Sequence, residues 1–229
     1  MSQNLLKRIV TSIILLSILF IINFSNTYIF ILSILILGLI ICYEANKIFL
    51  NLIVFNEYKN TRSIKKLNIK FLIFNTISFC YIFFIFCYCS YLIHSSLGAV
   101  FFLYVISICF FTDIGGYVFG KIIGGKKLTK ISPNKTLSGT IGSFIFCTFP
   151  LILFSKLGYL DLDFSLNKIL IIFLVSLVSQ LGDLFVSYLK RKAKVKDTGK
   201  ILPGHGGILD RLDGIVFAVP FSYFLLRLI

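Results

Sequence analysis

The chain has 229 residues, of which 58% are hydrophobic and only 14% charged, and its mean hydropathy is +0.96, which excludes a soluble domain that must wet its surface. The formal net charge of +14 would suit nucleic acid in a soluble protein, but here the basic residues stand between apolar runs, where they set membrane topology. We therefore expect an integral membrane protein, with no nucleic acid among its partners.

Seven apolar runs follow one another along the chain, and several of them reach or approach the roughly 20 residues that cross a bilayer as a helix. They are continuous rather than alternating, which excludes a transmembrane β-barrel. An amphipathic stretch at residues 48–55, suited to the interface or to a partial span, leaves the count at about six to nine. We predict an all-α, polytopic membrane protein of about seven spans, at residues 9–22, 28–43, 71–89, 97–119, 138–158, 168–188 and 208–229.

Basic residues are unevenly divided between the two sides of the membrane. On this count all but three of the 23 lie on one side, including the basic loop between the second and third runs, and the exceptions are Lys156, Lys168 and Arg227. The positive-inside rule then places the N-terminus in the cytoplasm and the C-terminus outside. The polar residues of the later spans gather at the cytoplasmic side, so we expect the functional site to face the cytoplasm.

A first polar block accompanies the fourth run and the connection after it. Gly116 and Gly120 form a small-xxx-small pair, for which helix packing and function are equally good interpretations. The spacing from Gly120 to Lys126 matches GxxxxGK, but Lys127 replaces the required Ser or Thr and a membrane span precedes it, so we reject a P-loop. Lys135 stands in a turn context where a fixed cation can meet phosphate.

The sixth run carries a polar stripe that centres on Asp183. A charged side chain in the middle of a span costs about 2.5 to 3.5 kcal/mol on insertion scales, offset here by apolar neighbours. Spacings of three and four residues place the stripe on one helical face, toward the bundle interior. Two interpretations stay open: hydrogen bonding between helices or a functional acid. The members are Ser176, Ser179, Gln180, Asp183 and Ser187.

The basic stretch 190–200 leads into Pro203-Gly204-His205-Gly206-Gly207 and then into the last run. Glycines let backbone N–H groups approach a ligand, and a new helix N-terminus favours negative charge, so this pattern is typical of a phosphate site. Asp210 and Asp213 are three residues apart and share a helix face, which suits a divalent cation or merely the helix dipole. His205 can bind phosphate, orient a neighbour or cap the loop.

Taken together, these motifs resemble the phosphatidate cytidylyltransferase, or CDP-diacylglycerol synthase, family. The resemblance covers roughly residues 100–229, and it departs from the family pattern at Leu137 and Ser138. It rests on Asp113 to Gly120, Ser132-Pro133-Asn134-Lys135-Thr136, Gln180-Leu181-Gly182-Asp183-Leu184, Ser187-x-Leu189-Lys190-Arg191, Lys196-Asp197-x-Gly199 and Leu202-Pro203-x-His205-Gly206-Gly207-Ile208-x-Asp210-Arg211-Leu212-Asp213.

The resemblance implies a reaction of phospholipid biosynthesis in which CTP and phosphatidate give CDP-diacylglycerol and pyrophosphate. It further implies Mg²⁺ with a second, monovalent cation, a homodimer, and the cytoplasmic (inner) membrane of a bacterium. The region 1–96 then holds N-terminal spans and the basic loop, and 97–229 is the catalytic region of a single membrane domain. Membrane lipid supplies one substrate.

Residue roles carry over only onto matching positions. The resemblance implies that Asp183, Asp210 and Asp213 are metal ligands and, with Lys196 and Arg211, catalytic residues. Substrate contacts are expected from Asp113, Lys121, Ser132, Lys135, Thr136, Lys190, Arg191, Asp197, His205, Gly206 and Gly207. A CTP-dependent lipid kinase, an archaeal-type CDP-lipid synthase and a transporter of anionic solutes are the alternatives, and the absence of an inverted repeat counts against the transporter.

Overall fold

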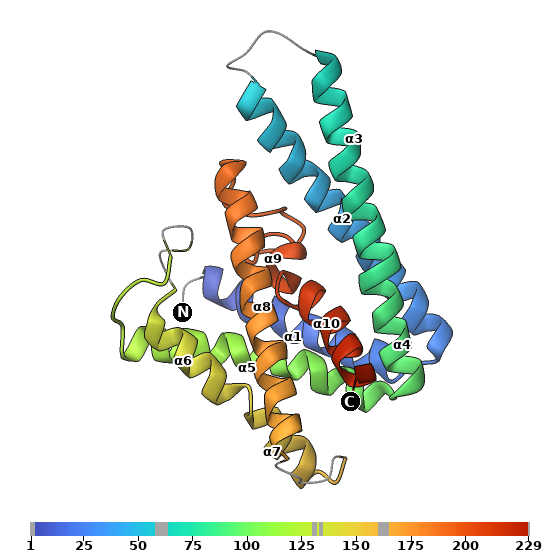
Figure 1. The fold of residues 1–229 in the computed structure, drawn as a ribbon, viewed down its shortest axis with the longest axis vertical. Helices are drawn as coiled ribbons and strands as arrows, with labels where there is room; N and C mark the ends of the chain where they lie inside the picture. The colour runs from blue at the N-terminus through green and yellow to red at the C-terminus, as the bar shows by residue number, and fades with distance from the viewer. Residues whose placement is uncertain (1–2, 58–63, 130–131, 133–134, 160–164, 229) are drawn as a thin grey trace. The chain divides into compact units, whose positions relative to one another are not determined.

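The computed structural model describes residues 3–57, 64–129, 132, 135–159 and 165–228 (Figure 1). Residues 58–63 of the predicted basic loop, and Pro133 and Asn134 of the first polar block, lie outside the described residues. Within that described part the secondary structure is helical, apart from two isolated β-bridges. The elements are α1 (Gln3–Asn23), α2 (Thr27–Glu57), α3 (Ile64–Cys80), the π-helical segment η1 (Tyr81–Cys87), α4 (Tyr88–Ser96), α5 (Ala99–Ile122), α6 (Leu137–Phe146), α7 (Phe149–Lys156), α8 (Leu166–Lys192), α9 (Leu209–Leu212) and α10 (Ile215–Leu228).

Each of the seven predicted apolar runs is largely helical where it is described, and the prediction of an all-α polytopic membrane protein is confirmed. Length and composition allow five helical stretches to cross a membrane among the described residues. The apolar part of α1, Ile9–Asn23, and the 14 residues of α10 are shorter. The side of the membrane on which each connection lies stays a prediction. The five stretches are Thr27–Ile53, Ile69–Ser96, Ala99–Ile122, Leu137–Lys156 and Leu166–Lys192.

Two compact units share the chain. The first comprises Met1–Tyr91 and Tyr188–Leu212, and the second comprises Leu92–Ser187 and Asp213–Ile229. The predicted division into 1–96 and 97–229 concerned catalytic role rather than packing, and it stays a prediction.

In the first unit, α2 packs along α3 and η1 (Figure 1). The rings of Phe49 and Phe74 stack with centroids 4.7 Å apart. Gly38 lies where a Cβ atom would come within 2.8 Å of the Cys87 sulfur, so the close approach requires glycine there. The helix continues through the amphipathic stretch 48–55 to Glu57 as one element of 31 residues, and this stretch is therefore no separate interfacial helix.

In the second unit, small residues bring α5 and α6 together (Figure 1). A Cβ atom on Gly116 would approach the Ser143 hydroxyl to 2.8 Å, and one on Gly120 would approach the Thr136 hydroxyl to 3.1 Å. The Ser143 hydroxyl also donates to the Thr112 carbonyl at 2.8 Å. Gly116 and Gly120 therefore do serve the packing of α5 against α6. Thr112 in turn donates to Ser176 at 2.9 Å, so part of the polar stripe on α8 joins helices.

Local sequence explains where α8 and α9 end. After α8, Lys194 adopts φ 54° and the Val195 N–H donates to the Lys190 carbonyl at 3.0 Å, the geometry of a left-handed helix cap. The last predicted run is broken after α9, because the Asp213 carboxylate accepts the Gly214 N–H at 3.0 Å and takes it from the helical pattern. The prediction that one helix face carries both Asp210 and Asp213 therefore does not apply as stated.

Candidate active site

The loop from Val195 to Ile208, here the 195–208 loop, belongs to the first unit and is anchored on Asp210. The Asp210 Oδ1 atom accepts the Lys190 ammonium at 2.7 Å. Its Oδ2 atom accepts the Thr198 N–H at 2.8 Å, the Gly207 N–H at 3.0 Å and the Thr198 hydroxyl at 3.1 Å. One carboxylate thus joins the end of α8, the start of the loop and the glycine pair near its end.

The surroundings of Asp210 favour its ionised form. Burial by itself would raise the pKa of this carboxyl, but the hydrogen bonds from Lys190, Gly207 and Thr198 outweigh burial and hold the pKa below its ordinary value. Asp210 is therefore an anion at neutral pH.

A second carboxylate, Glu44 of α2, holds the same loop. Its side chain is 1% exposed, and it accepts the Thr198 hydroxyl at 2.7 Å, the Ile208 N–H at 3.0 Å and the Leu209 N–H at 2.8 Å. Sequence reasoning gave Glu44 no role, and the second predicted apolar run stopped at residue 43, directly before it. The available signal was a lone acid within an apolar stretch that continues beyond it.

The N–H groups of Gly206 and Gly207, which were predicted to contact phosphate, donate to protein groups here. The Gly207 N–H donates to Asp210, and the Gly206 N–H donates to the Leu202 carbonyl at 3.2 Å. The ring nitrogens of His205 lie 2.6 Å from the Thr11 hydroxyl and 3.3 Å from the Ser12 hydroxyl, while its carbonyl accepts Arg211 at 3.1 Å. In this conformation the loop is held by protein groups, and its contacts with substrate stay predictions.

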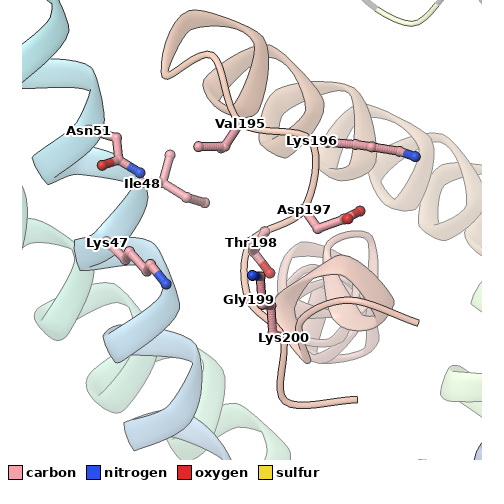
Figure 2. A pocket seen from close by; sticks show the side chains of 9 residues that line it. All are labelled: Lys47, Ile48, Asn51, Val195, Lys196, Asp197, Thr198, Gly199 and Lys200. Carbon is pink, nitrogen blue, oxygen red and sulfur yellow. The ribbon is translucent and has the colours of Figure 1, made fainter. Parts of the chain in front are cut away.

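A cavity of about 310 Å³ opens between α2 and the 195–208 loop (Figure 2). Three lysines, Lys47, Lys196 and Lys200, give its lining a positive charge, and Asp197 contributes one negative charge. Figure 2 shows Lys196 and Asp197 directed away from α2. The cavity adds Lys47 and Lys200 to the basic residues that the sequence had singled out; it is lined by Lys47, Ile48, Asn51, Val195, Lys196, Asp197, Thr198, Gly199 and Lys200.

The second unit holds an acidic pair with one cation. The Lys135 ammonium lies 2.5 Å from Asp183 Oδ2 and the Ser187 hydroxyl donates to Asp183 Oδ1 at 3.2 Å. The buried carboxyl of Asp213 is a neighbour of the Asp183 carboxyl. Sequence reasoning had chosen all three charged residues but had not paired them.

The residues of this pair fit a hard cation in chemical type. Two neighbouring carboxylates repel each other unless a positive charge or a proton lies between them, and Lys135 supplies only one charge. Magnesium typically takes one or two carboxylates and fills its other positions with water and substrate phosphates. Within the described part of the chain, no three His, Cys, Asp or Glu side chains group so as to bind a metal. A metal role for Asp183, Asp210 and Asp213 stays a prediction.

The other predicted site residues lie on helix ends and loops, except Asp113, which lies within α5. Lys121 is exposed and donates to the Tyr117 hydroxyl at 3.4 Å. Thr136 caps α6 by accepting the Gly139 N–H at 3.1 Å, and Ser132 accepts the Lys135 N–H at 3.1 Å. Four further predicted site residues are exposed: Asp113 on α5, Arg191 on α8, and Lys196 and Asp197 on the 195–208 loop.

Comparison with known proteins identifies the class of this chain. Residues 47–229 match the model of the cytidylyltransferase family, so the chain belongs to that family. This region includes every predicted site residue but not Glu44.

Three bacterial relatives of this chain bear the same name. Over 132 residues (57% of this chain and 49% of the relative) the sequence is 43% identical to the phosphatidate cytidylyltransferase of Bacillus subtilis. For that of Helicobacter pylori the identity is 42% over 125 residues (55% and 46%), and for that of Staphylococcus aureus 44% over 131 residues (56% and 50%). The chain spans about half the length of these curated relatives.

Proposed function

We propose that this chain is a phosphatidate cytidylyltransferase that converts CTP and phosphatidate into CDP-diacylglycerol and pyrophosphate. The observation that carries the proposal is the family match over residues 47–229, which takes in all the predicted site residues. The shared name of the relatives supports the choice of phosphatidate as acceptor.

The site chemistry agrees with this reaction. An oxygen of the phosphatidate phosphate attacks the α-phosphorus of CTP, and the bond to the β-phosphate bridging oxygen breaks with its electron pair leaving on pyrophosphate. The attacking oxygen is already anionic near neutral pH, so a Ser-His-Asp arrangement is not required. The protein has instead to align two polyanions and balance the charge that develops on the leaving group.

Basic side chains of the 195–208 loop and the end of α8 suit that task. Arg191 and Lys196 are exposed, and each can meet a phosphate without breaking an ion pair described above. Lys190 and Lys135 are already paired with Asp210 and Asp183, so their contribution to phosphate binding requires the substrate to compete with a carboxylate. Arg191 and Lys196 are therefore the first choices for phosphate contacts.

Cofactor, assembly and location belong to the same proposal. Bound magnesium would balance charge on the pyrophosphate, with Asp183, Asp210 and Asp213 as its proposed protein ligands and a monovalent cation in addition. The neighbouring carboxyls of Asp183 and Asp213 support this assignment. We further propose a homodimer in the cytoplasmic membrane of a bacterium, with the site on the cytoplasmic side, supported by the distribution of basic residues.

The position of the label in CTP tests the proposed function. The full chain in lipid nanodiscs is incubated with phosphatidate, magnesium and CTP labelled on either the α- or the γ-phosphate. We expect chloroform-soluble label from the α-labelled nucleotide alone, and none without phosphatidate or after chelation of magnesium. Label from the γ-phosphate would instead show a lipid kinase, and flux of an anionic solute without labelled lipid would show a transporter.

A further inference from the structure

Glu44 is a buried acid from the N-terminal part of the chain, three positions before the region that matches the family model. It lies in the apolar helix α2, yet its three hydrogen bonds all go to the other end of the sequence. Its partner Thr198 is 154 positions away, and Leu209 is 165 positions away. Burial of a charged carboxylate is favourable only where such hydrogen bonds compensate for lost water.

The three donors place Glu44 at the point where the 195–208 loop enters α9. The N–H groups of Ile208 and Leu209 stand at the start of that helix and have no partner one turn earlier. Thr198, near the start of the loop, donates its hydroxyl to Glu44 and its N–H to Asp210. Glu44 and Asp210 thereby hold the two ends of the loop together through one residue.

Two glycines of the loop are explained by the approach of Glu44. A Cβ atom on Gly199 or on Gly207 would collide with the carboxylate oxygens of Glu44, and one on Gly207 would also collide with the Thr198 hydroxyl. Glycine at both positions leaves the Glu44 carboxylate the room that it occupies here. The anion that lies beside these two glycines in this structure is thus the carboxylate of Glu44.

We propose that Glu44 is a positioning residue for cytidylyl transfer, an inference that rests on the proposed function. Through Thr198 and the start of α9, Glu44 fixes the loop that carries Lys196, Asp197 and His205. Small displacements of such groups cost large factors in rate, because the reacting polyanions must be aligned. Loss of Glu44 should therefore lower kcat rather than merely weaken the fold.

The variant Glu44→Gln separates charge from shape. Oε1 of Glu44 accepts the Ile208 N–H, and Oε2 accepts the Leu209 N–H. A glutamine amide has one oxygen, so in either orientation its NH₂ group faces one of these two backbone donors, and a backbone donor cannot reverse. The Thr198 hydroxyl can rotate to accept instead. Glutamine therefore preserves the volume of the side chain, but its NH₂ group faces the backbone N–H of Ile208 or Leu209, so that this N–H has no acceptor.

The experiment combines activity with hydrogen–deuterium exchange of the full chain in nanodiscs. For Glu44→Gln we expect kcat to fall roughly tenfold or more and the amides of residues 207–209 to exchange roughly tenfold faster. The matched control is Tyr43→Phe, an isosteric change at the neighbouring, 65% exposed position of α2, for which both quantities should match wild type. Thr198→Val should reproduce the loss from the other side of the contact, and Thr198→Ser, which retains the hydroxyl, should restore kcat.

Failure of this inference and failure of the proposed function look different. If wild type makes CDP-diacylglycerol while Glu44→Gln keeps kcat within about twofold, or loses kcat with unchanged exchange at 207–209, the positioning role is refuted and the activity stands. If wild type forms no labelled lipid, the proposed function fails, and the catalytic role of Glu44 fails with it whatever the exchange shows. If Glu44→Gln does not fold, Thr198→Val decides by the same two measurements.

Discussion

The ion pair between Lys190 and Asp210 allows a quantitative prediction of stability. Its Nζ–Oδ1 distance is 2.7 Å, and the side chains are only 15% and 7% exposed. Removing one partner leaves the other charge desolvated, which costs about 3 to 5 kcal/mol in buried pairs. We expect Lys190→Met and Asp210→Asn each to lower the free energy of unfolding by about 3 kcal/mol. In Asp210→Asn, the asparagine keeps one acceptor for Thr198 and Gly207 but opposes an NH₂ group to the Lys190 ammonium.

A double-mutant cycle isolates the pair. The double variant should lose less than the two single losses added together, with a coupling energy of roughly 1.5 to 3 kcal/mol. Reversible unfolding in mixed detergent micelles measures it. Arg191→Met, at the exposed neighbouring position, serves as control and should change stability by no more than about 0.5 kcal/mol. A coupling energy near zero would refute the pairing and leave Lys190 free for the substrate phosphate that the sequence assigned to it.

Three further outcomes follow from the same contacts. Since the pKa of Asp210 is lowered on folding, its stabilisation is complete above the unfolded value of about 3.9 and disappears as pH falls below it; unfolding measured against pH should show this loss in wild type but not in Asp210→Asn. Gly142→Ala should destabilise by about 1 to 3 kcal/mol, because its Cβ would strike Phe119, whereas Ile141→Ala at a 61% exposed position should cost less in the same unfolding assay. If Asp213 binds magnesium, Asp213→Asn should lower the rate of CDP-lipid synthesis more than a hundredfold. Raising the magnesium concentration should then recover part of that rate. Full activity of the variant without added metal would contradict the assignment.

The spans were predictable because membrane helices need long apolar runs, and hydropathy records these directly. The full extent of α2 was not predicted, since the apolar run was taken to stop at residue 43, before Glu44. In the structure that charge is buried against N–H donors of Ile208 and Leu209, and no local pattern reveals partners so far away along the chain.

The site was predicted as a set of residue types rather than as contacts. Asp183, Asp213 and Lys135 were chosen one by one, but their pairing depends on how α8 packs within its unit. The glycines at 206 and 207 were read as openings for a phosphate, whereas Gly207 faces Asp210 and Glu44. The same backbone freedom serves either anion, so sequence could not choose between them.

Product analysis of the reconstituted chain tests the central claim most directly. Nanodiscs that contain phosphatidate receive CTP and magnesium, and mass spectrometry follows the lipid while a coupled assay follows pyrophosphate. We expect CDP-diacylglycerol and pyrophosphate to appear in a one-to-one ratio and both to vanish when phosphatidate is replaced by diacylglycerol. Formation of phosphatidate from diacylglycerol, or pyrophosphate release without a cytidine-bearing lipid, would contradict it.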